Sequence, residues 1–100
     1  MSRSSTTVTI CRVIRRRVVA HGHVQGVFFR DSTRRAAARA GVTGWVANRA
    51  DGSVEAVLEG EEDAVARVVA FMHDGPRGAN VAWCDVDEEE PEGLEGFAVR

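Results

Sequence analysis

The chain has 100 residues, of which 44% are hydrophobic and 28% charged, and its formal net charge is -2. This length suits one domain with a single modest core and is too short for two. No apolar run approaches the ~20 residues of a membrane-spanning helix, and a pI of about 5.9 does not favour binding to nucleic acid through net charge. We therefore expect no membrane segment and no nucleic-acid partner.

The two halves of the chain differ in charge. No Asp or Glu precedes Asp31, whereas acidic residues crowd the stretch from Asp85 to Glu95. A small anion would be attracted toward the first half. We interpret the acidic stretch itself as a solvated loop.

Residues 1–10 are polar and rich in Ser and Thr, so we expect a frayed terminus followed by one domain over residues 11–100. The absence of an apolar secretory segment predicts a cytoplasmic protein. Cys11 and Cys84 lack the spacing of a zinc or redox motif, and we expect reduced thiols. Their strands would be neighbours in the fold predicted below, so a disulfide between them stays open.

The first half predicts a strand, a helix and a second strand. Residues 12–21 are rich in β-branched side chains. Regular alternation would turn Arg16 to the same face as Val18 and Ala20, so this strand either contains a bulge or begins later. Helical spacing follows, and Gly41 ends the helix. Its inward positions are Phe29, Thr33, Ala36, Ala37 and Ala40. Residues 42–48 form the next strand.

In the second half, Asp51-Gly52 predicts a hairpin turn into a return strand over residues 53–58. A second helix begins with acidic residues near Glu61 and is stopped by Gly75-Pro76. Strands at residues 81–86 and 97–99 complete the chain. This order predicts an α+β protein with a ferredoxin-like α/β sandwich, a βαββαβ unit plus a short terminal strand. Its sheet is mostly antiparallel, with two helices on one face.

The stretch from Gly22 to Arg30 is suited to binding a phosphate. A loop flanked by Gly22 and Gly26 can turn backbone N-H groups inward, and the helix that begins near Phe28 directs its positive end to the same place. Arg30 adds a charged fork that can hold two phosphate oxygens.

Asn48 ends a strand that the crossover places parallel to the first, so its side chain can approach this loop. A neutral amide can orient a water, whereas a carboxylate would repel the bound phosphate. The pattern indicates hydrolysis without a protein general base. That suits a leaving group such as a carboxylate, whose conjugate acid has a pKa of about 4.

These residues also carry a family resemblance. The stretch Gly22-His23-Val24-Gln25-Gly26-Val27-Phe28-Phe29-Arg30 matches the acylphosphatase signature over its whole length. The stretch Gly44-Trp45-Val46-Ala47-Asn48, followed by Gly52, Val54 and Gly60, matches its partner motif. Two such motifs in this order resemble the acylphosphatase family specifically.

The resemblance implies a small enzyme that hydrolyses the carboxyl-phosphate bond of acyl phosphates to carboxylate and inorganic phosphate, with no metal and no cofactor. We expect a monomer, since a small domain without an obvious apolar patch is monomeric by default. Arg30 would bind the phosphate and Asn48 would position the attacking water. The loop amides that would join Arg30 in binding the phosphate belong to His23, Val24, Gln25, Gly26, Val27 and Phe28.

Other interpretations are weaker. His21 and His23 could share a face as metal ligands, but no third ligand lies nearby in the sequence. Arg15 to Arg17 more simply form a cluster on the exposed face of the sheet than a nucleic-acid patch. Phe29 and Trp45 suit core packing, and Phe28 could pack or stack on a ligand.

Two other functions stay open. An RNA-binding module is disfavoured by the lack of paired aromatic strand motifs. A degenerate or regulatory binder of acyl phosphates, or a domain from a longer carbamoyl-transferring protein, is the second rival. We expect the stand-alone enzyme.

Overall fold

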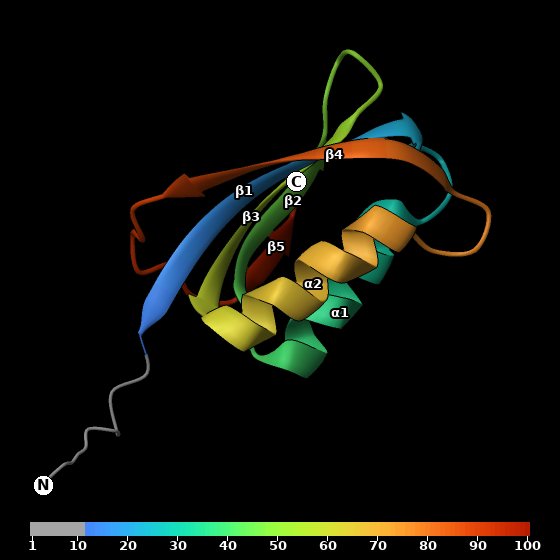
Figure 1. Cartoon of the computed structure of the whole chain (residues 1–100). Coiled ribbons are helices and arrows are strands. Elements are labelled where there is room, and N and C mark those ends of the chain that lie inside the picture. Colours follow the sequence, from blue (N-terminus) through green and yellow to red (C-terminus); the bar gives the residue numbers. More distant parts are fainter. Residues whose placement is uncertain (1–11) are drawn as a thin grey trace, which may run out of the picture.

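The computed structural model describes residues 12–100. The segment predicted to be frayed and Cys11 lie outside the described residues, and so does any pairing of Cys11 with Cys84. The elements, in order, are β1 (Val13–His23), α1 (Phe29–Ala40), β2 (Thr43–Asn48), β3 (Val54–Glu61), α2 (Glu62–Asp74), β4 (Asn80–Glu89) and β5 (Phe97–Val99). This is the predicted βαββαβ order with a short terminal strand (Figure 1).

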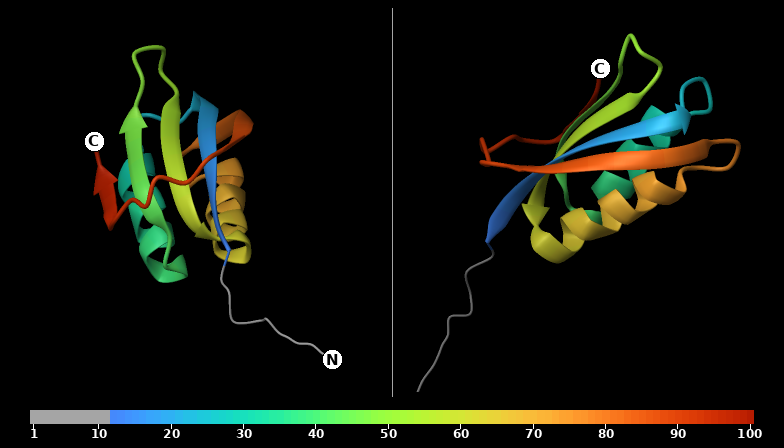
Figure 2. Two further views of the ribbon diagram at one scale, coloured as in Figure 1. Left: turned by 90° about the vertical axis from the view of Figure 1, so that its left-hand side faces the viewer. Right: turned by 45° about the horizontal axis from the view of Figure 1, so that its top comes forward.

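The strands form one sheet in the order β4-β1-β3-β2-β5. The pairs β1·β3, β1·β4 and β2·β3 are antiparallel, and β2·β5 is parallel. Both helices cover the same face (Figures 1 and 2). The predicted ferredoxin-like sandwich is therefore confirmed. Because β1 and β2 are both antiparallel to the strand between them, their C-terminal ends lie at the same edge of the sheet.

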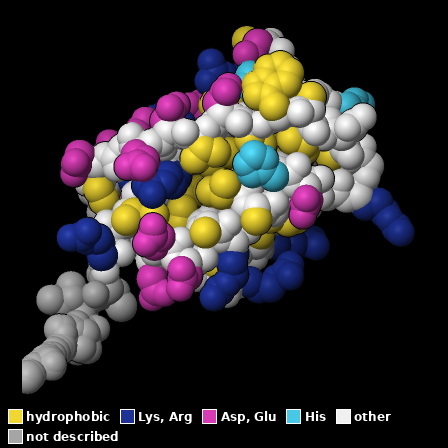
Figure 3. Space-filling view, viewed as in Figure 1, with side chains coloured by type: hydrophobic (Ala, Val, Ile, Leu, Met, Phe, Trp, Pro, Cys, Tyr) yellow, Lys and Arg dark blue, Asp and Glu magenta, His cyan; other side chains and the backbone are white. Residues whose placement is uncertain are grey.

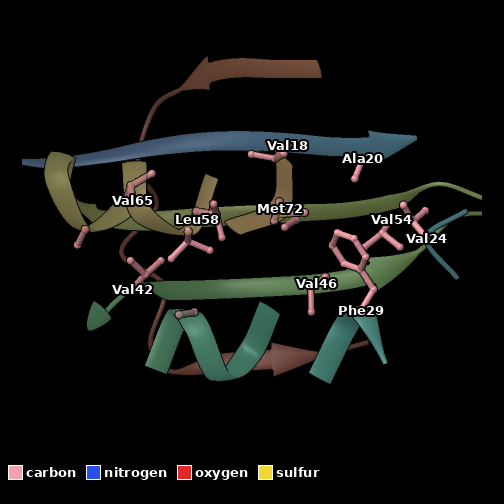
Figure 4. Close-up of a cluster of buried hydrophobic side chains, with 14 residues drawn as sticks. Val18, Ala20, Val24, Phe29, Val42, Val46, Val54, Leu58, Val65 and Met72 are labelled. Atoms are coloured by element: carbon pink, nitrogen blue, oxygen red, sulfur yellow. The ribbon is translucent and has the colours of Figure 1, made fainter. Parts of the chain in front are cut away.

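The hydrophobic core lies between the sheet and the two helices (Figure 4). Alternate residues of each strand point toward the helices, and the apolar stripes of α1 and α2 meet them. The core residues with almost no exposed surface include Val18, Ala20, Val46, Leu58, Phe29, Ala37, Val65 and Met72. Within residues 12–100 no helix has the length and apolar character needed to cross a membrane.

The first strand is regular where a bulge or a later start was predicted. β1 begins at Val13 and keeps its register with β3 through the arginines. Within residues 12–100 the one register shift of this strand lies farther on, between His21 and Gly22 opposite β4. Arg16 does point to the helix face. Its stem lines a hollow beside α2 while its guanidinium lies 3.9 Å from Glu88, so apolar atoms stay covered and the charge stays near water.

The face of the sheet away from the helices is covered by charged side chains and by the crossing segment, residues 90–96, which runs from β4 to β5 (Figure 2). Arg15 is only 5% exposed, and it donates to Glu59 at 2.9 Å and to Glu89 at 2.8 Å. Arg17 bonds to Glu89 and to Glu55. The prediction of an exposed arginine cluster is therefore wrong, because acidic side chains enclose Arg15.

The acidic stretch is likewise not only a solvated loop. β4 continues to Glu89, well beyond the predicted end at residue 86. The reason is pairing: Arg15, Arg16 and Arg17 lie opposite Glu89, Glu88 and Asp87 in the antiparallel register.

Two aromatic predictions have different outcomes. Phe29 is buried in the core as predicted. Trp45 is not a core residue: it lies on the open face, where the guanidinium carbon of Arg100 is 4.5 Å and that of Arg17 is 5.8 Å from the centre of its ring. Alternation requires this, since its neighbours Gly44 and Val46 are buried on the helix side.

Apolar side chains remain exposed between β4 and α2, on the face seen in Figure 3. Val69 and Val86 help line a hollow of about 330 Å³ there. This hollow is on the far side of the core from the C-terminal ends of β2 and β5.

Candidate active site

The loop that joins β1 to α1 is anchored at both ends by core residues. Val24 and Phe29 are buried, as Figure 4 shows. Between them, Gly26 and Phe28 have left-handed backbones, with φ of 77° and 60°. Phe28 is the only residue other than glycine with a positive φ in the described part of the chain. Left-handed residues at such a turn direct successive N-H groups to one side, which is the geometry of an anion-binding nest.

The backbone donors of this loop are free. Within residues 12–100, no protein acceptor takes the N-H groups of Gln25, Gly26, Val27 or Phe28. The first turn of α1 adds further N-H groups without helical partners and the positive end of the helix dipole. The loop therefore combines free donors with a favourable field for an anion.

The side chain of Gln25 binds the neighbouring hairpin. Its amide nitrogen donates to the carbonyl oxygens of Arg49 at 2.8 Å and Ser53 at 2.9 Å. These two residues close the hairpin between β2 and β3, since the N-H of Arg49 donates to Ser53 at 2.8 Å. Gln25 thus fixes the loop to the strand end that carries Asn48.

Arg30 and Asn48 meet at one hollow of about 300 Å³. The other residues that line it are Val24, Gly26, Phe28, Phe29, Asp31 and Val99. The two motifs found in the sequence therefore converge in space, one from the start of α1 and the other from the end of β2.

Arg30 is held in place by the last described residue. Its Nη1 donates to the main-chain oxygen of Arg100 at 2.8 Å. The backbone of Arg100 is fixed in turn, because its N-H donates to Val46 at 2.8 Å. A guanidinium has five N-H donors, so one contact with a main-chain oxygen leaves others for a ligand.

Asn48 is exposed at the end of β2, opposite Val54 of β3. Its side-chain amide makes no hydrogen bond within residues 12–100. Both its acceptor and its donors are available to a small molecule in the hollow.

The remaining predicted loop residues lie around the hollow rather than in its lining. His23 is the last residue of β1, paired with Asn80 of β4. Val27 is half-buried and lines a neighbouring hollow. Their backbone amides remain predicted ligands, and neither side chain lines the hollow.

Asp31 brings a negative charge to the rim, and two arginines of α1 largely offset it. Arg34 donates to it at 2.8 Å and Arg35 at 3.0 Å. The hydrogen bond from Arg34, helped by the charge of Arg35, holds the pKa of Asp31 below its usual value. At neutral pH this carboxyl group is ionised and has no proton to give.

Comparison with known proteins identifies the family. The family model described as Acylphosphatase matches residues 16–99. The chain belongs to the acylphosphatase family. The enzyme class predicted from the two motifs is thereby confirmed.

Individual relatives of this acylphosphatase cover most of the chain. An acylphosphatase of Rubrobacter xylanophilus is 55% identical over 85 residues, which are 84% of this chain and 77% of the relative. One of Haloarcula marismortui is 49% identical over 86 residues, covering 86% and 94%. The solved acylphosphatase from Coxiella burnetii has a TM-score of 0.85 at 38% identity and covers 88% of this chain and 93% of its own.

The structure adds Asp31, Val99 and Arg100 to the surroundings of the site. Asp31 follows Arg30 directly, and an acid in the first turn of a helix is a signal that the sequence does contain. Val99 and Arg100 had no such signal, because the pairing of β5 beside β2 brings them there from the far end of the chain.

The two histidines weighed as metal ligands separate in the structure. His21 stacks on Trp83, with ring centres 4.4 Å apart, and its Nε2 lies 3.0 Å from Asp85. His23 is exposed at the strand end. Within residues 12–100, no group of three or more His, Cys, Asp or Glu residues is arranged to hold a metal ion.

Proposed function

We propose that this acylphosphatase hydrolyses the carboxyl-phosphate bond of acyl phosphates by binding the phosphate between Arg30 and the loop amides of residues 23–28, while Asn48 positions the attacking water. The observation that carries this proposal is the convergence of Arg30, Asn48 and the left-handed loop on one hollow.

Three features favour a dianionic phosphate in this hollow. The free N-H groups of the loop can donate to its oxygens, and the start of α1 supplies a positive field. The fork of Arg30 can bind two oxygens at once with short, charge-assisted hydrogen bonds. Since these donors are fixed before the substrate arrives, they can stabilise the transferring phosphoryl group without reorganising.

The reaction needs a water in line with the bond that breaks. The amide of Asn48 accepts a hydrogen bond from this water and fixes its direction of attack. The water oxygen bonds to phosphorus, the bond from phosphorus to the carboxyl oxygen breaks, and its electron pair leaves with the carboxylate. The water's proton passes to a phosphate oxygen, so the products are a carboxylate and inorganic phosphate.

No protein group has to protonate the leaving oxygen. A carboxylate is a stable anion at neutral pH, because its conjugate acid has a pKa of about 4. The carboxyl group at the rim, Asp31, has a lowered pKa and is ionised there. The site therefore suits acyl phosphates better than phosphate esters of alcohols, whose leaving group requires a proton.

The test is the hydrolysis of benzoyl phosphate in the presence of EDTA by the wild-type chain, Arg30→Ala and Asn48→Ala. Loss of a fixed donor to a developing charge costs roughly a hundredfold to a thousandfold in rate, so each variant should lose at least about a hundredfold. Arg39→Ala and Asn80→Ala are matched controls, because both residues are exposed and neither lines the hollow.

Circular dichroism must show all five proteins folded. Wild-type activity in EDTA with loss only in the two site variants would support the proposal. Equal losses in the controls would refute the assigned roles, and activity that disappears with EDTA would refute metal independence. A wild-type chain that binds inorganic phosphate but hydrolyses nothing would be a binding protein.

A further inference from the structure

A second hollow, of about 430 Å³, lies beside the candidate active site. It shares Phe28 and Asp31 with the first hollow. Phe28 is 83% exposed, although large apolar side chains are usually covered. Because Phe28 lines both hollows, a molecule whose phosphate occupies the first can extend past this residue into the second.

The second hollow contains two arginines, Arg35 from α1 and Arg77 from the turn after α2. Arg35 is already paired with Asp31 at 3.0 Å. Arg77 is exposed and has no ion pair or hydrogen bond from its side chain to another residue in 12–100. The hollow therefore carries an uncompensated positive charge.

The backbone that carries Arg77 is fixed. The N-H of Gly75 donates to Phe71 at 2.7 Å, and that of Ala79 donates to Pro76 at 3.0 Å. The turn also packs closely, since a Cβ at Gly75 would lie 3.3 Å from the ring of Phe29. Arg77 is thus held at a defined place relative to the start of α1.

We propose that the second hollow binds the acyl part of the substrate and selects acyl phosphates that carry a second anionic group. The carbon skeleton lies over Phe28, and the distal carboxylate or phosphate meets Arg77. This inference rests on the proposed hydrolysis and adds the substrate class. A neutral acyl group gains only the apolar contact.

The experiment compares three substrates: benzoyl phosphate, 4-carboxybenzoyl phosphate and 4-carbamoylbenzoyl phosphate. The last two have nearly the same size, and only one has the extra charge. Each is assayed with the wild-type chain, Arg77→Ala, Arg77→Glu and the control Arg67→Ala. Arg67 is an exposed arginine of α2 that lines a different hollow, between the two helices. Comparing variants cancels the intrinsic reactivity of each substrate.

The quantity to compare is the ratio of kcat/KM for the carboxy substrate to kcat/KM for the carbamoyl substrate. This ratio should be about fivefold higher in the wild-type chain than in Arg77→Ala, which is the effect of one partly exposed ion pair. Arg77→Glu should lower the ratio further, and Arg67→Ala should leave it unchanged. Benzoyl phosphate should be hydrolysed equally by the wild-type chain and Arg77→Ala. Raising the salt from about 0.01 M to about 1 M should reduce the wild-type preference, since the charges are near solvent.

The inference would be overturned if the carboxy-to-carbamoyl ratio in Arg77→Ala were as high as in the wild-type chain. It would also be overturned if Arg67→Ala lowered this ratio as much as Arg77→Ala, which would mean general attraction of anions. Hydrolysis of all three substrates with the same carboxy-to-carbamoyl ratio in the wild-type chain and Arg77→Ala would overturn the inference and leave the proposed function standing. Hydrolysis of none of the substrates would overturn both.

Discussion

Removal of Glu59 should destabilise the protein more than removal of any exposed acid. Its side chain is 1% exposed and accepts a hydrogen bond from Arg15 at 2.9 Å. It also accepts three backbone N-H groups of the crossing segment, those of Glu92 at 2.8 Å, Gly93 at 3.1 Å and Leu94 at 3.0 Å. One carboxylate thus ties the centre of the sheet to the segment that covers its open face.

The expected cost follows from what Glu59→Ala leaves behind. Arg15, which is only 5% exposed, would lose one buried partner of its guanidinium, and removal of one member of a buried pair costs about 3–5 kcal/mol. Domains of this size unfold with a total of roughly 5–15 kcal/mol, so this loss is a substantial part of the stability of the chain. Glu95→Ala, an exposed acid of the same segment, should change the free energy of unfolding by no more than about 0.5 kcal/mol.

Urea unfolding followed by circular dichroism measures both variants, and amide hydrogen exchange of residues 92–94 reports the local release of the segment. A loss below about 1 kcal/mol in Glu59→Ala, or the same loss in Glu95→Ala, would refute the reasoning. Glu59→Gln should restore part of the stability, because its amide oxygen can still accept backbone N-H groups.

The same carboxylate predicts a dependence on pH. Burial alone would raise the pKa of Glu59, but the N-H groups of Glu92 and Leu94 and the guanidinium of Arg15 hold it below its usual value. A lowered pKa means a contribution that is complete above the unfolded pKa of about 4.3 and is lost as the pH falls through the folded value. Glu59→Gln should therefore lose less stability than the wild-type chain between neutral pH and about pH 3.

Three further predictions concern other parts of the chain. Glu89 also has a lowered pKa, because arginines of β1 donate to it. In Glu89→Gln the free energy of unfolding, measured in urea at several pH values, should therefore fall less steeply toward acid pH than in the wild-type chain. The same dependence on pH in both proteins would contradict this. A Cβ at Gly44 would lie 1.8 Å from a carbonyl oxygen of β3, whereas one at Gly52 meets open space. Gly44→Ala should accordingly lower the free energy of unfolding in urea by at least about 3 kcal/mol. Gly52→Ala strains only a left-handed backbone and should lower it by about 1–2 kcal/mol. Equal losses in the two variants would contradict the close approach at Gly44. Burial raises the pKa of Cys84 to about 11, so in a Cys11→Ser chain iodoacetamide should modify the native thiol at pH 8 roughly a hundredfold more slowly than in urea, and similar rates would contradict its burial.

The fold could be predicted from the sequence because its signals are local. The alternation of β-branched residues, the helical spacing from Phe29 and the stop at Gly41 each depend on a few neighbouring residues, and the structure has elements at all these places. The errors concern length and exposure. β4 runs to Glu89 because its acidic residues have arginines opposite them, and a single strand read alone does not show its partner.

The wrong predictions for Arg15 and Trp45 have the same cause. Arg15 and Trp45 lie on the face of the sheet away from the helices, and their surroundings depend on the crossing segment and β5. Nothing near either residue in the sequence indicates that a distant segment will cover that face. Alternation does predict which face each residue occupies, and that part was sufficient to place Arg16 with the helix-side residues.

The candidate site shows the same division between local and distant information. Arg30 and Asn48 could be named from motifs because a loop, a helix start and a strand end are each encoded nearby. The contact of Arg30 with the main chain of Arg100 could not, because it requires the last strand to pair in parallel with β2. That strand reaches its position only after the crossing segment has passed over the sheet, where Glu59 binds it. The carboxylate of Glu59, which stabilises the open face, therefore also helps to determine where Arg100 lies relative to Arg30.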